Sequence, residues 1–426
     1  MTVAHLRATR FAVIMTVVMA APSVTDSLAD LDSGVLLGTG GKALRLSVIT
    51  DPNKFERLQP EWDAVIGRDP NATVFQTWEW QYTWWRHFGR GKKPFILLMS
   101  SDSDGSPCAI APLILKPYAS RPLRELAFMG LGVSDYLDIV SLPAYREKAA
   151  ARAFEQIESS ATAWDIVDLH QVRAGSLVDQ AGLNGTGDCR REVVDHEVCP
   201  VVELSASWDE YKASLGKSLR FNIGYYERSL RKQYDVEIGL ATAESLDAEM
   251  DSLFRLHTQR WRSRKLPGVL SGSRIQAFHK EAARRFVDRG WLRLYYLKLD
   301  GVTRASLYCF AFSDSVYYYL GGFDPELSKY GPGTILTARA IRDAIEDGRS
   351  RFDLLRGCED YKLRWKPDLR MNSRILIQKP GVRSGLARGM HNVEMRVEHA
   401  YKLRMNQTPG PDLTVSGSVR TKNESA

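Results

Sequence analysis

The sequence has few cysteines, and their placement excludes several classes of protein. Its 426 residues include five, Cys108, Cys189, Cys199, Cys309 and Cys358, an odd number at wide spacing. No two of them form a CxxC pair, and no Cys/His cluster appears at the spacing of metal ligands. A structural zinc site and a disulfide framework are therefore not indicated, and we expect no metal. The pattern is typical of a reducing compartment.

Long apolar runs are also missing, except for one short run near the N-terminus. Arg7 and Arg10 precede the apolar stretch 11–21, and small residues follow it. This is the layout of a signal peptide, but the run is too short to span a bilayer easily. A start codon placed too far upstream explains the same segment. We therefore expect a poorly ordered extension over residues 1–41 and no stable membrane span. We expect the protein to lie in the cytoplasm, either free or attached to the membrane surface. Export by the signal-like segment is the alternative.

The composition is that of a basic globular protein. There are 58 Lys and Arg residues against 51 Asp and Glu, which gives a net charge of +7. With 44% hydrophobic and 26% charged residues, the chain is long enough for two or three domains. A basic balance favours anionic partners, such as the phosphates of coenzyme A, a lipid-linked sugar or RNA. A generally basic surface without a specific partner is the alternative.

Two halves of the sequence repeat one order of predicted elements. In each half, helices precede an antiparallel meander with a tight acidic turn, at Asp104–Gly105 and at Asp300–Gly301. A further helix and strand follow in each half. The pattern predicts an α+β fold with two related domains, 42–200 and 201–380, each a mixed, mostly antiparallel sheet flanked by helices. The basic segment 381–426 is expected to be a partly disordered tail.

A glycine-containing loop before a helix is the first candidate binding element. Gly331 and Gly333 flank a proline, and the helix follows directly. Glycine permits a tight turn and close backbone approach, and proline presets the first helical turn. Amide groups at a helix N-terminus attract anions. We predict a pyrophosphate-binding loop, with an ordinary connector as the alternative. The predicted loop residues are Lys329, Tyr330, Gly331, Gly333 and Thr334.

Several motifs together resemble one family. In the second half these are Gly321–Pro325, Tyr330–Gly333, Phe352–Gly357 and Glu359–Lys362 with Trp365. Further motifs are Trp78–Trp80, Ala109–Leu113, Ser218–Arg220 and His257 with Arg260–Trp261. They are similar to the CelD-like acyltransferases of the GNAT (Gcn5-related N-acetyltransferase) superfamily, which are associated with cellulose and exopolysaccharide biosynthesis. That group is in turn similar to the Fem-type aminoacyltransferases, which build peptidoglycan bridges.

The resemblance implies tandem GNAT-like domains and acyl-CoA as the donor. The strand before the glycine loop would be the splayed central strand, with the donor thioester beside it. The loop Ser328–Gly333 matches the superfamily pattern, Gln/Arg-x-x-Gly-x-Gly/Ala, only in its glycines. This departure leaves aminoacyl-tRNA, the donor of Fem-type relatives, as an alternative.

The resemblance also implies residue roles. Acyl transfer needs a deprotonated nucleophile, a stabilised oxyanion and a proton for the leaving group. Tyr361 lies where superfamily members often place a tyrosine that protonates the leaving thiolate. Asp353 would orient or deprotonate the acceptor, and His257 is the histidine expected in a cleft; structural roles are the alternatives for all three. The predicted substrate contacts are Trp80, Asp135, Tyr136, Arg220, Arg356 and Lys362.

The sequence thus predicts transfer of an acyl group from acyl-CoA to an amine or hydroxyl of a cell-envelope or exopolysaccharide precursor. One alternative is a Fem-type transferase that uses aminoacyl-tRNA and acts on a peptidoglycan-like precursor. Another is a non-catalytic accessory of polysaccharide biosynthesis, in which the aromatic segment 75–88 binds sugar.

Overall fold

The computed structural model describes residues 44–118, 123–181, 188–263, 268–405 and 419–420. The extension expected over residues 1–41 lies outside them. The chain divides into two compact units, which we call the inner unit and the flanking unit. The inner unit is Val198–Arg370, and the flanking unit is formed by the described residues on either side of it in the sequence.

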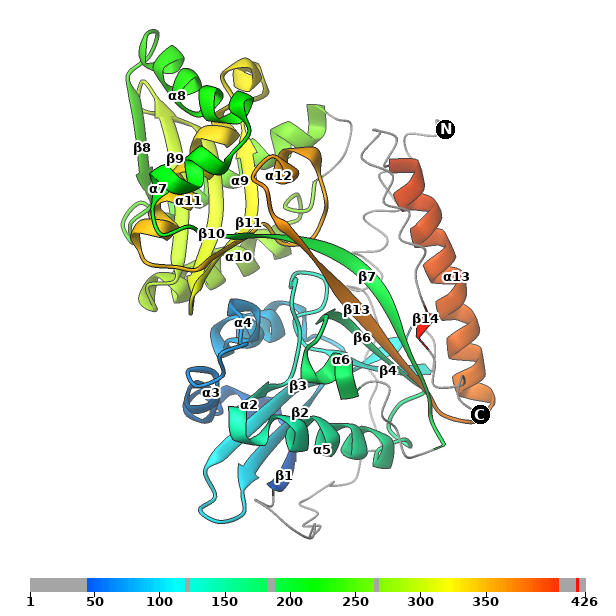
Figure 1. Ribbon diagram of the computed structural model, residues 1–426. Helices are drawn as coiled ribbons and strands as arrows, with labels where there is room; N and C mark the ends of the chain where they lie inside the picture. Colours follow the sequence, from blue (N-terminus) through cyan, green and yellow to red (C-terminus); the bar gives the residue numbers. More distant parts are fainter. Residues whose placement is uncertain (1–43, 119–122, 182–187, 264–267, 406–418, 421–426) are drawn as a thin grey trace. The chain divides into compact units, whose positions relative to one another are not determined.

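The flanking unit contains a mostly antiparallel sheet with helices beside it (Figure 1). Its strand order is β1-β2-β3-β4-β6-β13-β7, and of these pairs β4 and β6 are parallel. The strands are β1 (Leu44–Ile49), β2 (Lys93–Ser101), β3 (Pro107–Tyr118), β4 (Leu123–Phe128), β5 (Val140–Ser141), β6 (Ile166–Arg173), β7 (Arg190–Glu203), β13 (Asp368–Gln378) and β14 (Val419–Arg420). The helices are α2 (Pro52–Glu56), α3 (Gln59–Ile66), η1 (Val74–Gln76), α4 (Trp78–Phe88), η2 (Pro143–Tyr145), α5 (Arg146–Ser159), α6 (Leu177–Ala181) and α13 (Val382–Met405).

Helix α13 forms part of the segment expected to be a tail, and it is held to the flanking sheet by charged groups. Arg383 donates to both carboxylate oxygens of Asp165, at 3.0 Å each. Beneath the helix, Arg374 of β13 donates to both oxygens of the buried Asp168, at 2.7 and 2.5 Å. Burial raises the pKa of Asp168, but Arg374 and His170 outweigh it and hold that pKa well below its usual value.

The inner unit is a second mixed sheet, covered by helices on both faces. Its strand order is β7-β12-β11-β10-β9-β8, in which β7 contributes its last residues. The strands are β8 (Val236–Leu240), β9 (Leu292–Leu299), β10 (Val302–Phe312), β11 (Ser315–Phe323) and β12 (Arg351–Asp353). The helices are α7 (Trp208–Ser214), α8 (Lys217–Arg231), α9 (Leu246–Ser263), α10 (Ser273–Asp288), η3 (Pro325–Tyr330), α11 (Pro332–Glu346) and α12 (Asp360–Leu363).

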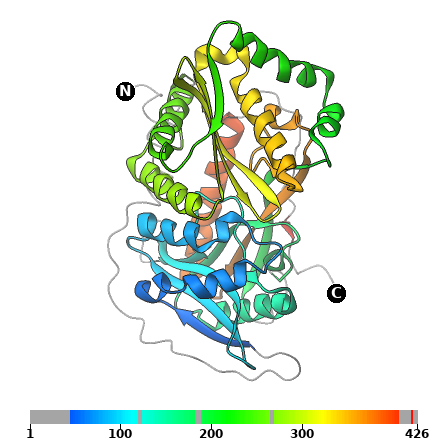
Figure 2. The same ribbon diagram turned by 90° about the vertical axis from the view of Figure 1, so that its left-hand side faces the viewer.

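The two helical layers of the inner unit lie on opposite faces of its sheet (Figure 2). Helices α7, α8 and α11 pack on the face that carries Tyr295, Leu307 and Tyr318. Helices α9 and α10 cover the other face, where the ring of His279 lies 5.8 Å from that of Tyr308. Leucine, isoleucine and aromatic side chains alternate between the two faces, as the pleat of a strand requires.

Within the described residues, no helix combines the length and the apolar character needed to cross a bilayer.

Glycine at position 322 permits the close approach of α9 to β11. A Cβ atom there would lie 2.6 Å from the backbone nitrogen of His257 and 2.9 Å from the carbonyl carbon of Leu256. Backbone atoms cannot move aside as a flexible side chain can. The glycine therefore sets the distance between the helix and the strand.

We expect Gly322→Ala to destabilise the protein by about 1–3 kcal/mol, the usual cost of overpacking a core. The measurement is urea unfolding followed by circular dichroism. Gly333→Ala is the matched control, because a Cβ at position 333 meets no atom closer than 3.8 Å. Equal stabilities of the two variants would show that α9 does not depend on this contact.

Candidate functional site

The central feature of the inner unit is the separation of two neighbouring parallel strands. β11 pairs with β12 only from Ser315 to Tyr317, opposite Arg351 to Asp353. Beyond that point β11 continues to Phe323 beside β10. β12 pairs with β7 on its other side, and the chain after β12 keeps bonding to β7, through Leu354 N–H to Pro200 O and Gly357 N–H to Val198 O, both at 2.9 Å. The sheet therefore opens between the two strands.

A bulge re-aims side chains of β11 beside this opening. Tyr308 of β10 lies opposite Leu320, whereas Cys309 lies opposite Tyr318, so Tyr319 is an extra residue in the strand. A bulge of this kind bends a strand and is common next to functional sites. The hydroxyl oxygen of Tyr318 lies 2.9 Å from the position that a Cβ on Gly321 would take. The side chain of Tyr318 therefore runs along its own strand toward Phe323.

The loop after β12 is held in a strained conformation by two predicted site residues. Leu355 and Gly357 both have positive φ, +56° and +97°. The carboxylate Oδ1 of Asp353 accepts from Leu355 N–H at 2.8 Å. The ammonium group of the buried Lys362 donates to the carbonyl oxygens of Arg356 at 2.6 Å and Gly357 at 3.2 Å. These contacts offset the backbone strain and fix the opening on the β12 side.

Tyr361, the predicted proton donor, lies at this opening. Its side chain is 36% exposed, and its ring lies 6.4 Å from that of the buried Tyr318. Desolvation raises the pKa of Tyr361 well above its usual value, and Tyr318 and Glu359 raise it further, while Arg260 opposes them. Burial likewise raises the pKa of Tyr318 to about 12. Both phenols are therefore neutral proton carriers at physiological pH.

Arg260 of α9 supplies positive charge to the same cluster. Its guanidinium lies 4.9 Å from the ring centre of Phe323, in a cation–π contact. It opposes the rise in the pKa values of Tyr318 and Tyr361, and it adds to the lowering of the pKa of His257. A fixed cation beside neutral hydroxyl groups is suited to stabilise negative charge that develops during a reaction.

His257 is buried against β11 and is not placed as a base. Its Nε2 accepts a hydrogen bond from Trp261 Nε1 at 2.9 Å. Because an indole N–H only donates, the proton of the neutral imidazole lies on Nδ1. That Nδ1 has no hydrogen-bond partner among the described residues. Burial lowers the pKa of His257 to about 4, with a smaller contribution from Arg260. A catalytic role for His257 stays a prediction.

The predicted anion-binding loop has fewer available amides than the sequence suggested. Gly331 has a φ of +52° and ends η3, where its N–H donates to Ser328 O at 3.1 Å. The ring of Tyr226 packs on it, 2.5 Å from where a Cβ would lie. Pro332 has no N–H, and Thr334 N–H donates back to Gly331 O. Gly331 is needed for the turn itself, and pyrophosphate binding stays a prediction.

Two side chains of this loop contact their own surroundings. The hydroxyl of Tyr330 donates to Gln233 Oε1 at 2.9 Å, at the end of α8. The ammonium of Lys329 lies 4.9 Å from the ring centre of Tyr330 and is exposed.

The other predicted contacts lie in several places. Trp80 is fully buried in the flanking unit and donates to Ser134 Oγ at 2.8 Å. Asp135 and Tyr136 are also buried there, and Asp135 O accepts from Asn372 Nδ2 at 2.7 Å. Arg220 is exposed on α8 of the inner unit and donates to Ala213 O. The structure gathers only the β12–α12 group, Asp353, Arg356, Tyr361 and Lys362, around the opening.

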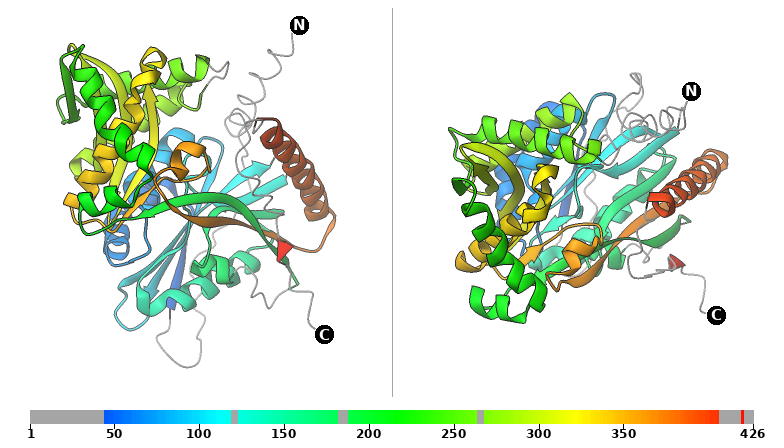
Figure 3. Two further views of the ribbon diagram at one scale, coloured as in Figure 1. Left: turned by 45° about the horizontal axis from the view of Figure 1, so that its top comes forward. Right: turned by 90° about the horizontal axis from the view of Figure 1, so that it is seen from above.

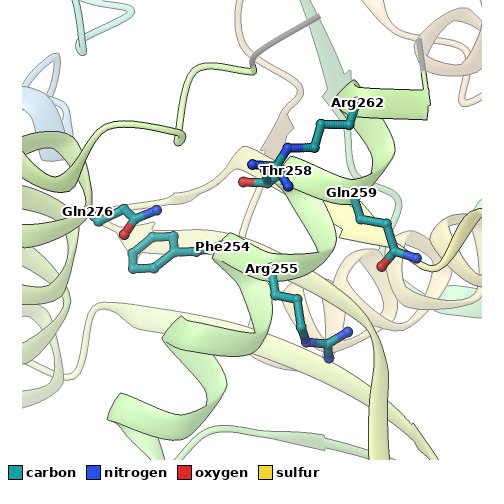
Figure 4. A pocket seen from close by; sticks show the side chains of 6 residues that line it. All are labelled: Phe254, Arg255, Thr258, Gln259, Arg262 and Gln276. Atoms are coloured by element: carbon teal, nitrogen blue, oxygen red, sulfur yellow. The ribbon is translucent and has the colours of Figure 1, made fainter. Parts of the chain in front are cut away.

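A shallow hollow of about 440 Å³ lies on the surface between α9 and α10 (Figure 4). The ring of Phe254 faces Gln276 across it, and Arg262 reaches toward Thr258. Arg255 and Gln259 of α9 also line it.

Two residues of the cluster, Tyr318 and Arg260, were not among the predicted site residues, although Arg260 belongs to one of the family motifs. Arg260 follows His257 by three residues and precedes Trp261, so helical spacing places all three on one side of α9. That spacing was a usable signal. Tyr318 lies in a run of three tyrosines, and no pattern distinguishes the one that faces the opening, because the bulge shifts the alternation.

The geometry agrees with a known class of domain. Residues 217–363 match the family model described as an acetyltransferase (GNAT) domain, which is less than half of the chain. This part of the inner unit is therefore similar to a GNAT acetyltransferase domain. No curated protein matches the sequence.

Solved structures extend the similarity to both units. FemX has a TM-score of 0.55 at 12% identity, over 74% of this chain and 95% of FemX. A conserved protein of unknown function from Bacteroides thetaiotaomicron has a TM-score of 0.51 at 10% identity, over 78% of this chain and all of that one. L-PGS from Bacillus licheniformis has a TM-score of 0.46 at 14% identity, over 80% of this chain and 94% of that one. These identities show the fold alone, and the predicted α+β fold is confirmed.

Among the described residues, no group of three or more His, Cys, Asp or Glu side chains is arranged to hold a metal ion.

The buried state of His257 gives stability a pH dependence. The unfolded chain protonates this histidine near its ordinary pKa of 6.5, whereas the folded chain resists protonation down to about pH 4. The unfolded state therefore binds more protons between these values. We expect the free energy of unfolding to fall as the pH is lowered from 6.5 to 4, and to fall less steeply in His257→Gln. Urea unfolding at several pH values measures both slopes, and identical slopes contradict the prediction.

Proposed function

We propose that the chain transfers an acyl group from acyl-CoA to an amine or hydroxyl of a cell-envelope or exopolysaccharide precursor. The observation that carries the proposal is the separation of β11 from β12, with the hydroxyl of Tyr361 at the opening. The match of this unit to an acetyltransferase domain supports the reaction class. An extended donor fits such an opening because the unpaired edge of β11 offers backbone groups to it.

The reaction assigns a simple task to Tyr361. The acceptor nitrogen or oxygen attacks the thioester carbonyl carbon and loses its proton to solvent, and a tetrahedral oxyanion forms. When this intermediate collapses, the carbon–sulfur bond breaks and the thiolate leaves. Tyr361 then donates its phenolic proton to the sulfur, and solvent restores that proton. The raised pKa of Tyr361 keeps its phenol group protonated until the thiolate leaves.

Arg260 is proposed to stabilise the negative charge of the transition state. Charge passes from the oxyanion to the leaving thiolate, and a guanidinium held beside Tyr318 and Tyr361 favours both stages. Asp353 is proposed to orient the acceptor. Its Oδ1 already accepts from Leu355 N–H, which fixes the carboxylate in place.

The second candidate function keeps this site and exchanges the donor for aminoacyl-tRNA. One observation favours it: Gly331 N–H is already bonded and Pro332 has no N–H, so the loop offers few amides to a pyrophosphate. The leaving group would then be a ribose hydroxyl, and Tyr361 would protonate oxygen in place of sulfur. The acceptor would be a peptidoglycan-like precursor.

Replacing Tyr361 with phenylalanine tests the proton donor. We expect kcat to fall about 100-fold, the usual contribution of a general acid, with little change in KM. Initial rates of thiol release from acyl-CoA, measured with an amine-bearing saccharide acceptor, check this. Tyr296→Phe is the control because it also removes a tyrosine hydroxyl, one that donates to Glu237 of β8 at an exposed position. An unchanged kcat in Tyr361→Phe would show that Tyr361 is not the proton donor, whereas no turnover by the natural chain would favour a non-catalytic accessory role.

The donor is tested by thermal unfolding with coenzyme A, acyl-CoAs and charged tRNA. Acyl-CoA at a hundredfold excess over its Kd should raise Tm by about 5 °C, because ligand binds the folded state alone. Tyr361→Phe should show the same rise, since the substitution affects proton transfer and not donor binding. No rise with any acyl-CoA, together with salt-dependent binding of charged tRNA, would establish the second candidate in place of the first.

A further inference from the structure

Helix α8 presents a cationic face that the proposed chemistry does not use. The face is formed by Lys217, Arg220, Arg228, Arg231 and Lys232, all exposed. The helix contains one acidic residue, Glu227, and Arg231 pairs with it at 2.8 Å. Among the described residues, none forms a hydrogen bond or ion pair with the side chains of Lys217, Arg228 or Lys232. The face therefore carries a net excess of uncompensated positive charge.

Two exposed aromatic rings lie within this cationic face. Phe221 is 61% exposed and Tyr225 47% exposed, and their rings stack 5.4 Å apart with an interplanar angle of 19°. Spacings of four, seven and four residues place Lys217, Phe221, Arg228 and Lys232 on one side of the helix. Large exposed rings are costly in water and mark an interaction surface when they are grouped.

The face is fixed outward because the opposite side of α8 is packed. Leu219 and Leu230 are buried in the core of the inner unit, and Tyr226 packs against Gly331. Figure 3 shows α8 at the periphery of the inner unit. Its 15 residues extend about 22 Å at the rise of an α-helix. The cations and rings therefore form a rigid, convex strip.

We propose that this strip docks the protein on an anionic membrane surface. Lys and Arg attract anionic lipid headgroups, and Phe and Tyr rings settle at the depth of the headgroups. A convex helix can lie along a flat surface with all of these side chains in contact. Exposed Lys329, beside Tyr330 whose hydroxyl bonds to Gln233 at the end of α8, extends the positive charge in the same direction.

Single-stranded RNA is the competing partner, and the shape of the face argues against it. Proteins that bind single strands follow the phosphate backbone with a positively charged groove and stack bases on aromatic rings inside it. Here one ring already covers a face of the other, and both rings are exposed on the outward side of a helix. The deep, narrow major groove of an RNA duplex does not admit a helix.

Membrane docking would serve the proposed function, and this inference rests on that function. A cell-envelope precursor carried on a lipid is confined to a membrane surface, so an enzyme held there meets its acceptor at high local concentration. The vesicle experiment below needs no turnover. Its failure and the failure of the transferase proposal can therefore be told apart.

The experiment is sedimentation of the full chain with vesicles. One set contains phosphatidylglycerol and phosphatidylcholine in equal amounts, and the other contains phosphatidylcholine alone. We expect binding to the anionic set, weakened by salt. The triple variant Lys217→Gln, Arg228→Gln and Lys232→Gln should bind about 100-fold more weakly, at about fivefold for each cation. The control triple, Arg274→Gln, Arg284→Gln and Arg342→Gln, removes equal charge from exposed sites on α10 and α11 and should bind like the natural chain.

One further variant, a double substitution, separates the rings from the charge. Phe221→Ser with Tyr225→Ser should reduce binding to anionic vesicles while keeping its salt dependence, because the charges remain. Circular dichroism confirms that each variant is folded. The proposal is overturned if the natural chain does not sediment with anionic vesicles, or if the two charge triples lose binding equally. It is also overturned if single-stranded RNA binds to the α8 cationic face while vesicles do not.

Discussion

The arrangement of the inner unit depends on the early end of one strand pairing. β12 pairs with β11 on one side for three residues, while the pairing with β7 on its other side continues beyond them. The turn at which the pairing with β11 ends places Leu355 and Gly357 at positive φ, which costs free energy for a leucine. Asp353 and Lys362 offset that cost with hydrogen bonds to the turn. Without them the two strands could pair further, and the opening that holds Tyr361 would close.

The electrostatics of the opening follow from burial around a single cation. Tyr318 and Tyr361 keep their protons because their surroundings disfavour phenolate, and His257 stays neutral because its ring is buried. Arg260, the cation they share, therefore acts on two neutral phenols and a neutral imidazole, with Glu359 as an acidic neighbour of the phenols. A charge is most effective where the groups around it do not screen it, and this is the arrangement that a reaction with a developing anion requires.

The two units use charge in opposite ways. In the flanking unit, Arg374 and Asp168 are buried under α13 and satisfy one another, so they fix the place of the helix more than they add to stability. In the inner unit, the cations of α8 lie outside and have few partners. A buried charge is stable only when it is paired within the protein, whereas an exposed charge is solvated and can bind a partner outside the protein.

The sequence by itself determined the local features of this protein. Hydrophobic periodicity and acidic turns gave the α+β fold, and proline after a glycine gave the start of α11, because these depend on a few neighbouring residues. The motif around Phe352–Gly357 also led to the segment where Tyr361 lies. Only the tertiary structure decided which side chains face the opening. Lys362 was expected to contact the substrate, but its ammonium group points inward and donates hydrogen bonds to the carbonyl groups of the strained turn. Gly331 is covered by the ring of Tyr226, which lies on a helix far away in the sequence. Tyr318 and Arg260 come from separate elements, and they meet through the bulge in β11 and the packing of α9. Such contacts join residues far apart in the chain, so no local pattern records them.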